Sequence, residues 1–158
     1  MASQAESGTA ARSAASPTLG LRCVVVTPER TVLDEPVDFV AIPLYDGELG
    51  VLPGRSPLIA RLGFGELRVR ADGSVRRYFV EGGFVQIRDD VVTLLTNRSL
   101  PAHQIDAAAV ARELEHIQDI RAITDQELAE KSRKLERERA LLRVSRHRSD
   151  SAAASANS

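Results

Sequence analysis

Short apolar runs separated by turn residues fill the chain from position 21 to position 96. In the clearest run, Leu67, Val69 and Ala71 alternate with charged neighbours, which is the period of a strand with one buried and one solvated face. The runs have strand length and recur at the spacing of an all-β sandwich or barrel. The pattern therefore predicts an N-terminal antiparallel β-sandwich or barrel of about ten short strands over residues 20–97, connected as a continuous meander.

Two turn signals of different kinds lie in the segment DGELGVLPGRSPLIARL at residues 46–62. Asp46-Gly47 predicts a tight type I′ hairpin, because both central residues of that turn have positive φ, which Asp tolerates and Gly adopts freely. Pro53-Gly54 predicts a type II turn, in which Pro presets φ and Gly takes the positive φ. Further turns or bends are predicted at Asp72-Gly73, Gly82-Gly83 and Asp89-Asp90.

Helical periodicity begins after a linker at residues 98–105. Asp106 is a good N-cap residue, and Val110, Leu114 and Ile117 recur on one helical face. These features predict a first C-terminal helix that begins near position 106.

A second helix is predicted from the capping-box pattern of Thr124 to Glu127, in which each side chain meets the other residue's backbone amide. Along this helix, Leu128, Leu135 and Leu142 form a narrow apolar seam, whose burial contributes several kcal/mol at most. We expect a two-helix antiparallel hairpin over residues 106–148, with a second helix held weakly enough to detach.

The two ends of the chain differ from the rest in composition. Residues 1–19 and 149–158 are rich in Ala and Ser and nearly devoid of large apolar side chains, so we expect disordered tails. The balance of 21 basic against 22 acidic residues gives no field that points to nucleic acid or to a membrane surface. No segment approaches the ~20 apolar residues of a membrane span. The lone Cys23 lies in an apolar run, which indicates a core residue in a reducing compartment.

A search for catalytic chemistry yields little. His103, His116 and His147 are scattered, which argues against a metal site. Neither Lys131 nor Lys134 follows a glycine, and because they are the only lysines, a Walker A phosphate loop is excluded. The residues therefore show no assembled catalytic set.

Three segments carry a resemblance to a known family. Residues 47–58 are similar to the stretch GELG(I/V)LPGH(A/S)PL of the epsilon subunit of bacterial F-type (rotary) ATP synthases, with Arg55 where that family usually has His. Residues 79–85 resemble the family's (V/S)GG(F/I)(V/L) step, and residues 22–30 resemble its opening strand and turn. The resemblance extends over residues 21–148.

This resemblance implies a noncatalytic central-stalk subunit of a proton-translocating ATP synthase. The β-domain would couple the gamma shaft to the membrane c-ring, and the helical hairpin would regulate ATP hydrolysis by meeting the alpha and beta subunits of the catalytic head. The chain would then lie on the cytoplasmic side of the bacterial inner membrane as a peripheral protein, attached to the membrane only through the complex.

The resemblance also assigns residues to three contacts. The c-ring contact falls on Tyr45, Asp46, Gly47 and Glu48. The gamma contact falls on Gly54, Arg55 and Ser56. The regulatory beta-subunit contact falls on Lys131, Arg133, Lys134 and Arg137. Without the resemblance, the four basic residues of the last contact are equally typical of a solvated helix face, because cations are favoured near the C-terminal end of a helix.

Some members of the family bind ATP through an (I/L)DxxRA motif. Ile105 and Asp106 match its start, but Ala109 stands where the arginine belongs, so a phosphate group would lose its bidentate partner. We therefore expect no cofactor and interpret Asp106 as a helix cap.

Two alternatives from other classes stay open on the residues alone. A nucleic-acid-binding β-barrel with a basic helix would need aromatic platforms and a basic groove on its strands, whereas several of the six aromatic residues lie in apolar runs. A small hydrolase would need an assembled acid, base or nucleophile, which the sequence does not offer.

Overall fold

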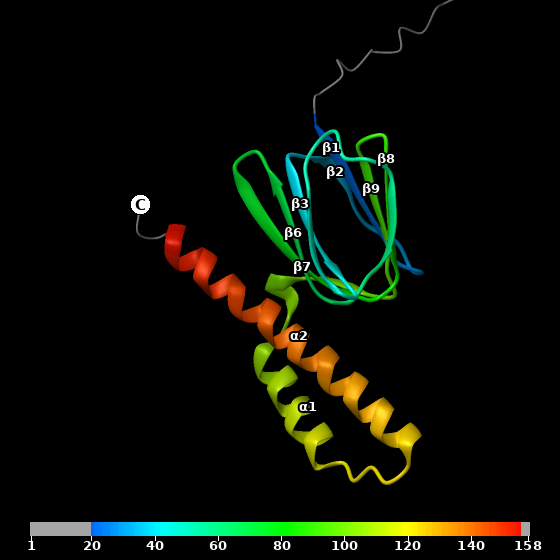
Figure 1. The fold of residues 1–158 in the computed structure, drawn as a ribbon. Helices are drawn as coiled ribbons and strands as arrows, with labels where there is room; N and C mark the ends of the chain where they lie inside the picture. Colours follow the sequence, from blue (N-terminus) through cyan, green and yellow to red (C-terminus); the bar gives the residue numbers. More distant parts are fainter. Residues whose placement is uncertain (1–19, 156–158) are drawn as a thin grey trace, which may run out of the picture.

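The structure is a computed structural model that describes residues 20–155, so the tail predicted over residues 1–19 lies outside the described residues. Within the described range, ten strands form two facing five-stranded sheets, and two helices follow them (Figure 1). This arrangement confirms the predicted β-sandwich followed by a helical hairpin.

The two sheets are named here sheet A and sheet B. Sheet A has the order β2-β1-β9-β8-β5 and contains β1 (Leu21–Val26), β2 (Thr31–Val37), β5 (Leu58–Arg61), β8 (Phe84–Arg88) and β9 (Val91–Leu95). Sheet B has the order β10-β7-β6-β3-β4 and contains β3 (Phe39–Leu44), β4 (Gly47–Val51), β6 (Phe64–Ala71), β7 (Ser74–Glu81) and β10 (Ser99–Pro101).

The prediction that the strands follow one another as a continuous meander is wrong. The chain passes repeatedly from one sheet to the other, and β1 runs parallel to β9, with Arg22 opposite Val91. The parallel pairing joins the β1–β2 and β8–β9 hairpins into one sheet. The physical reason is that each sheet has one apolar face, and the chain must supply both layers for the two faces to cover each other.

Part of the predicted linker at residues 98–105 belongs to sheet B. Ser99–Pro101 pair with β7, and Ala102–Gln104 form the short 3-10 helix η1. Proline usually interrupts a strand, but β10 lies at the edge of the sheet, where a missing N–H is tolerated. The sandwich therefore extends through residue 101.

The turns agree with the sequence in part. Asp72 and Gly73 have φ of 51° and 76°, and Asp89 and Asp90 have φ of 50° and 60°, as type I′ hairpins require. The type I′ turn predicted at Asp46-Gly47 is wrong, because Leu44 pairs with Gly47 and leaves Tyr45 and Asp46 as the loop residues. Only Gly47 of these has positive φ, at 151°. Gly54, with φ of 85°, fits the predicted type II turn.

An apolar cluster between the sheets forms the main core. It includes Leu21, Cys23, Val25, Val40, Ile42, Leu67, Val69, Val85, Ile87, Val92 and Leu94. Cys23 is fully buried in this cluster, which confirms it as a core residue, and this burial raises the pKa of its thiol to about 12.

The helices begin where the capping signals predict. Helix α1 spans Ala107–Asp119, and the Asp106 carboxylate accepts the amides of Ala108 and Ala109 at 3.1 Å each. Helix α2 spans Asp125–Ser155, so it continues past the predicted end at residue 148 into the predicted C-terminal tail, whose residues 156–158 lie outside the described range. The Thr124–Glu127 capping box is present, with N–O distances of 3.0 and 3.2 Å.

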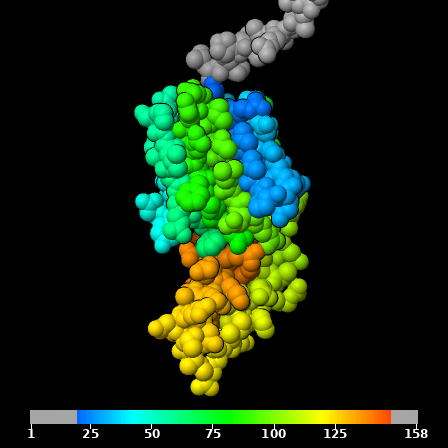
Figure 2. Space-filling model, turned by 90° about the vertical axis from the view of Figure 1, so that its right-hand side faces the viewer, coloured from blue at the N-terminus to red at the C-terminus, as the bar shows by residue number. Residues whose placement is uncertain are grey.

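Helix α2 packs against the sandwich through a second apolar cluster. Its members are Phe79, Ala102, Ile105, Ala140, Leu141 and Val144. The narrow apolar seam of Leu128, Leu135 and Leu142 is therefore not the main buried face of α2, and Leu128 is 48% exposed. Figure 2 shows the orange part of α2 against the end of the sandwich, with the yellow hairpin turn furthest from it.

Candidate interaction sites

The loop between β3 and β4 holds the four residues assigned to the c-ring. Tyr45 is 71% exposed, and the Arg61 guanidinium of β5 lies 4.6 Å from the centroid of its ring. The Tyr45 amide donates to the Arg61 carbonyl at 2.9 Å. An edge strand of sheet A thus fixes this loop of sheet B, and the carboxylates of Asp46 and Glu48 stay exposed.

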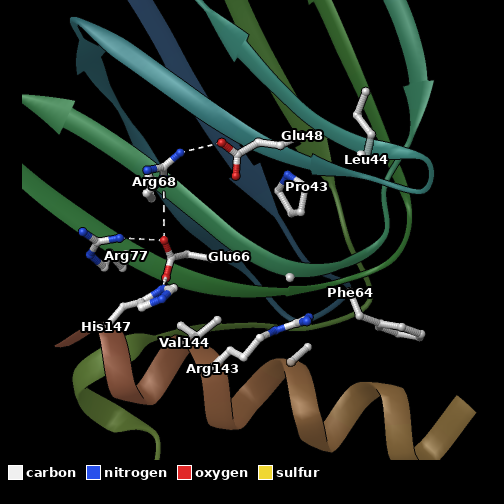
Figure 3. A pocket seen from close by; sticks show the side chains of 13 residues that line it. Pro43, Leu44, Glu48, Phe64, Glu66, Arg68, Arg77, Arg143, Val144 and His147 are labelled. Atoms are coloured by element: carbon white, nitrogen blue, oxygen red, sulfur yellow. Dashed lines mark hydrogen bonds and ion pairs between the residues drawn. The ribbon is translucent and has the colours of Figure 1, made fainter. Parts of the chain in front are cut away.

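Four charged or titratable side chains link this hairpin to α2 and are named here the ionic chain: Glu48, Arg68, Glu66 and His147 (Figure 3). Arg68 Nη2 lies 2.5 Å from Glu48 Oε1, and Arg68 Nε lies 3.7 Å from Glu66 Oε1. Glu66 Oε1 also accepts a hydrogen bond from Arg77 at 2.6 Å, while His147 Nδ1 lies 2.6 Å from Glu66 Oε2. The sequence pattern predicts a solvated Glu66, whereas α2 covers this end of β6 and leaves the Glu66 side chain 14% exposed.

An open hollow of about 520 Å³ lies between the base of the β3–β4 loop and α2 (Figure 3). Its lining includes Leu44, Glu48, Glu66, Arg143 and Val144. The β3–β4 loop and the end of the helical hairpin, which are far apart in sequence, therefore face each other at one end of the sandwich.

The residues assigned to gamma lie at the other end of β4. Gly54, Arg55 and Ser56 are exposed, and the Gly54 amide donates to the Asp90 carboxylate at 2.7 Å. The β8–β9 turn thus positions this loop, and a second open hollow of about 780 Å³ lies beside it.

The outer face of sheet A carries an apolar patch that the sequence analysis missed. Ile59, Phe84 and Leu95 are 73%, 58% and 55% exposed, and Phe84 pairs directly with Leu95 on the neighbouring strand. The alternation along β8 contains the signal, since Val85 and Ile87 point into the core and Phe84 must then point outward.

The basic residues assigned to the beta subunit fall into two pairs. Lys131 donates to the carbonyls of Gln118 and Ile120 at 3.0 and 2.7 Å, and Arg137 pairs with Glu81 at 3.1 Å. Arg133 and Lys134 are exposed, and among the described residues neither forms an ion pair. The structure thus leaves Arg133 and Lys134 accessible and uses the other two within the subunit.

The start of the ATP motif has structural roles here. Ile105 is buried in the second apolar cluster, and the Asp106 carboxylate caps α1. Within the described residues, no group of three His, Cys, Asp or Glu side chains is placed to hold a metal ion. None of the described helices is long and apolar enough to cross a membrane.

Two carboxyl groups in the hairpin have shifted pKa values. Burial raises the pKa of Glu138, although Arg137 beside it acts in the opposite direction. Hydrogen bonds from the amides of Ile123 and Thr124 lower the pKa of Glu127. The two shifts make the stability of the hairpin depend on pH in opposite senses.

Comparison with known proteins gives the family. The ATP synthase, Delta/Epsilon chain, beta-sandwich domain family matches residues 20–102. The ATP synthase epsilon chain of Rhodopirellula baltica is 47% identical over 128 residues, which cover 81% of this chain and 100% of that protein. The epsilon chain of a Synechococcus species is 35% identical over 116 residues, or 73% of this chain and 85% of that one.

Solved structures agree with these relatives. A chain of the mitochondrial ATP synthase of Euglena gracilis has a TM-score of 0.72 and 26% identity, with 78% of this chain and 79% of that chain covered. A chain of the Tetrahymena thermophila mitochondrial ATP synthase central stalk and c-ring has a TM-score of 0.64 at 12% identity, over 80% of this chain and 96% of that chain, and shares the fold. The sandwich, the two C-terminal helices and the sequence matches together show that this chain belongs to the ATP synthase epsilon chain family.

Proposed function

We propose that this chain couples the gamma shaft to the c-ring in the central stalk of a proton-translocating ATP synthase. The observation that carries the proposal is that exposed loops lie at both ends of β4, with residues 45–48 at one end and residues 54–56 at the other. Between them lies a close-packed core, which transmits strain instead of absorbing it. Family membership favours this role over the nucleic-acid-binding and hydrolase alternatives.

On the c-ring side, the β3–β4 loop offers an aromatic ring and two carboxylates. Tyr45 is braced by Arg61, so its ring is already ordered before a partner binds. Asp46 and Glu48 are exposed charges on a tight turn and can reach polar groups of a c-ring loop. The contact is thereby polar and oriented.

On the gamma side, the proposed contact surface consists of residues 54–56 together with the apolar patch of sheet A. A lasting interface buries on the order of 1,000 Å² or more, which exceeds what a loop of this size supplies. The exposed Ile59, Phe84 and Leu95 add apolar area of the kind that marks protein interaction sites.

The hairpin has the regulatory role in this proposal. Arg133 and Lys134 are the accessible cations for acidic loops of the beta subunits. In this proposal α2, which packs against the sandwich here, leaves the sandwich to meet the alpha and beta subunits. The complex holds the chain on the cytoplasmic side of the bacterial inner membrane. No cofactor is needed, and isothermal calorimetry of the chain with ATP should give no binding heat, because Asp106 is occupied as a cap and Ala109 offers no guanidinium.

The test is an ATP synthase reconstituted with variants of this chain. Asp46→Lys reverses a charge of the loop without touching the Glu48–Arg68 pair, and we expect it to lower ATP-driven proton pumping while the melting temperature stays unchanged. Asp34→Lys is the control for charge reversal, because Asp34 is an exposed carboxylate on sheet A, outside residues 45–48, where it pairs with Arg22. Normal pumping with Asp46→Lys, at a normal level of assembled enzyme, would remove the loop from the c-ring contact.

A further inference from the structure

We propose that the ionic chain of Glu48, Arg68, Glu66 and His147 couples the state of the β3–β4 loop to the docking of α2, so that a partner which engages Glu48 loosens the helix. The proposal rests on the proposed function in one respect, namely that the β3–β4 loop meets a partner. The coupling itself is a property of the subunit alone.

Glu66 is the shared element of the ionic chain. Its Oε1 serves two guanidinium groups, with Arg77 Nη1 at 2.6 Å and Arg68 Nε at 3.7 Å. Its Oε2 serves His147 Nδ1 at 2.6 Å, and because an ionised carboxylate only accepts hydrogen bonds, Nδ1 carries the hydrogen. The side chain is 14% exposed, so water competes little for these oxygens. The three donor side chains Arg77, Arg68 and His147 therefore share one carboxylate.

Arg68 is the movable element. Its Nη2 is held by Glu48 at 2.5 Å, which keeps the guanidinium at 3.7 Å from Glu66, and its Nε is buried without a hydrogen-bond partner. An arginine binds a carboxylate most strongly through two parallel hydrogen bonds. If a cation of the partner takes Glu48, Arg68 is free to use both oxygens of Glu66, and it then displaces His147 from Oε2.

The charges around His147 make this displacement consequential. Beside it in Figure 3 lie Glu66 and Arg68 from β6 and Arg77 from β7, whereas Arg143 of its own helix extends toward Phe64, and Glu48 lies beyond Arg68. The contact with Glu66 Oε2 at 2.6 Å joins His147 of α2 to β6 of the sandwich. On the N-terminal side of His147, the docked helix is held by the apolar cluster and by Arg137 against Glu81. Loss of the His147 bond therefore loosens the C-terminal side of the docked segment.

The experiment measures the docked fraction of α2 in the full, isolated chain. Spin labels on Ser74→Cys in β7 and Arg139→Cys in α2 report the distance between the sandwich and the helix, and the buried Cys23 thiol stays unlabelled. Glu48→Gln imitates engagement by a partner, and His147→Ala removes the bond to Glu66. Each is expected to raise the undocked population about two- to fivefold, the range of a partly exposed ion pair.

The combination of variants decides the outcome. We expect Glu48→Gln to add nothing in the His147→Ala background and to have no effect in the Arg68→Met background, because its action passes through Arg68 and Glu66. Asp34→Asn, which breaks the Arg22–Asp34 pair on sheet A, is the control and should leave docking unchanged. Thermal melting confirms that each variant is folded.

Two results would overturn the proposal: an undocked fraction unchanged in Glu48→Gln, or effects of Glu48→Gln and His147→Ala that multiply as independent changes do. The measurement needs no c-ring, so it separates this proposal from the proposed function. If Asp46→Lys leaves proton pumping normal while Glu48→Gln raises the undocked fraction, the coupling exists but the c-ring is not its partner. If Asp46→Lys lowers pumping while Glu48→Gln leaves docking unchanged, the loop contacts the c-ring but is not coupled to α2.

Discussion

Arg137 of α2 lies beside Glu81 at the end of β7, with its Nε 3.1 Å from Glu81 Oε1. The buried Arg137 Nε lacks an aligned hydrogen bond, so the contact is an ion pair held by distance and charge. The same guanidinium lies 3.4 Å from Glu138, which is buried under the sandwich. One arginine thus serves two carboxylates at the junction of the domains.

The Glu138 carboxyl gives a prediction about pH. Burial raises its pKa above the ordinary value of 4.5, against the opposing effects of Arg137 and Arg98. Because the folded pKa is raised, the associated stability is fully present below the pKa of the unfolded state and is lost as pH rises through the folded pKa. We expect Glu138→Gln to match the parent near pH 4 and to exceed its free energy of unfolding at pH 7. Denaturant titrations at the two pH values measure this, and a parent advantage at pH 7 would contradict it.

The buried face of α2 gives a second prediction. Leu141 is buried in the second apolar cluster, and Leu141→Ala should cost about 2–4 kcal/mol of docking or unfolding free energy. Leu128→Ala is the matched control on the same helix, and at 48% exposure it should cost less than about 1 kcal/mol. Denaturant unfolding with limited proteolysis of α2 measures both. Equal losses of free energy in the two variants would mean that the seam of Leu128, Leu135 and Leu142 contributes as much to docking as the second apolar cluster does.

Much of the local structure follows from the sequence, because it is fixed by neighbours in the chain. The Asp106 cap and the Thr124–Glu127 box are interactions within one helical turn, and residues 67–71 alternate along one strand. The parallel pairing of β1 with β9 joins segments that are far apart, and no local signal encodes it. Strand β10 cannot be predicted locally because Pro101 argues against a strand. A proline is tolerated at a sheet edge, and which strand lies at the edge is set only when the whole sheet forms.

The candidate sites show the same division. The loops at residues 45–48 and 54–56 can be located from their turn residues and the resemblance. The bond between His147 and Glu66 joins positions 81 residues apart, and it exists only because α2 lies across β6. Leu135 and Leu142 stand out in the sequence by spacing, whereas Ala140 and Val144 bind the sandwich because they face Phe79. The spacing within a helix does not reveal which face meets another domain.

Glycine at the crossing from β7 to β8 gives a third prediction. A Cβ at Gly83 would lie 1.9 Å from the Leu95 carbonyl oxygen, and Gly83 has φ of 102°. Gly83→Ala should therefore cost more than about 3 kcal/mol or prevent folding. Gly73→Ala has the same kind of strain at φ of 76° but open space around it, and it should cost about 1 kcal/mol. Thermal unfolding and soluble yield compare the two, and similar losses would mean that the backbone moves away at Gly83.

The capping box gives a fourth prediction, with the opposite pH sense. The amides of Ile123 and Thr124 donate to Glu127 Oε2 at 2.9 and 3.0 Å and lower its pKa below the ordinary value of 4.5. Its contribution is therefore present above pH 4.5 and is lost as pH falls through the lowered pKa. In acid the parent should lose helix content, and Glu127→Gln should show less of this loss. Circular dichroism between pH 2 and pH 6 measures it, and identical acid transitions would show that the box does not contribute.

The accessible cations of α2 give the last prediction. Arg133→Glu with Lys134→Glu should raise ATP hydrolysis by the assembled enzyme and leave the unfolding of the subunit unchanged, because both side chains are exposed. Lys131→Glu is the contrasting variant, since Lys131 binds the carbonyls of Gln118 and Ile120 at the end of α1, and its loss should destabilise the hairpin.

Charge reversal is a sharper test than removal of α2, because truncation also uncovers Phe79 of the sandwich. The measurement is ATP hydrolysis at low and high salt, with assembly checked by co-purification of the complex. An electrostatic brake weakens as salt screens its charges, so the parent should hydrolyse faster at high salt and the doubly reversed variant should respond little. Unchanged hydrolysis in the reversed enzyme at both salt concentrations would make Arg133 and Lys134 part of a solvated helix face, and the regulatory role would have to rest on other residues of the hairpin.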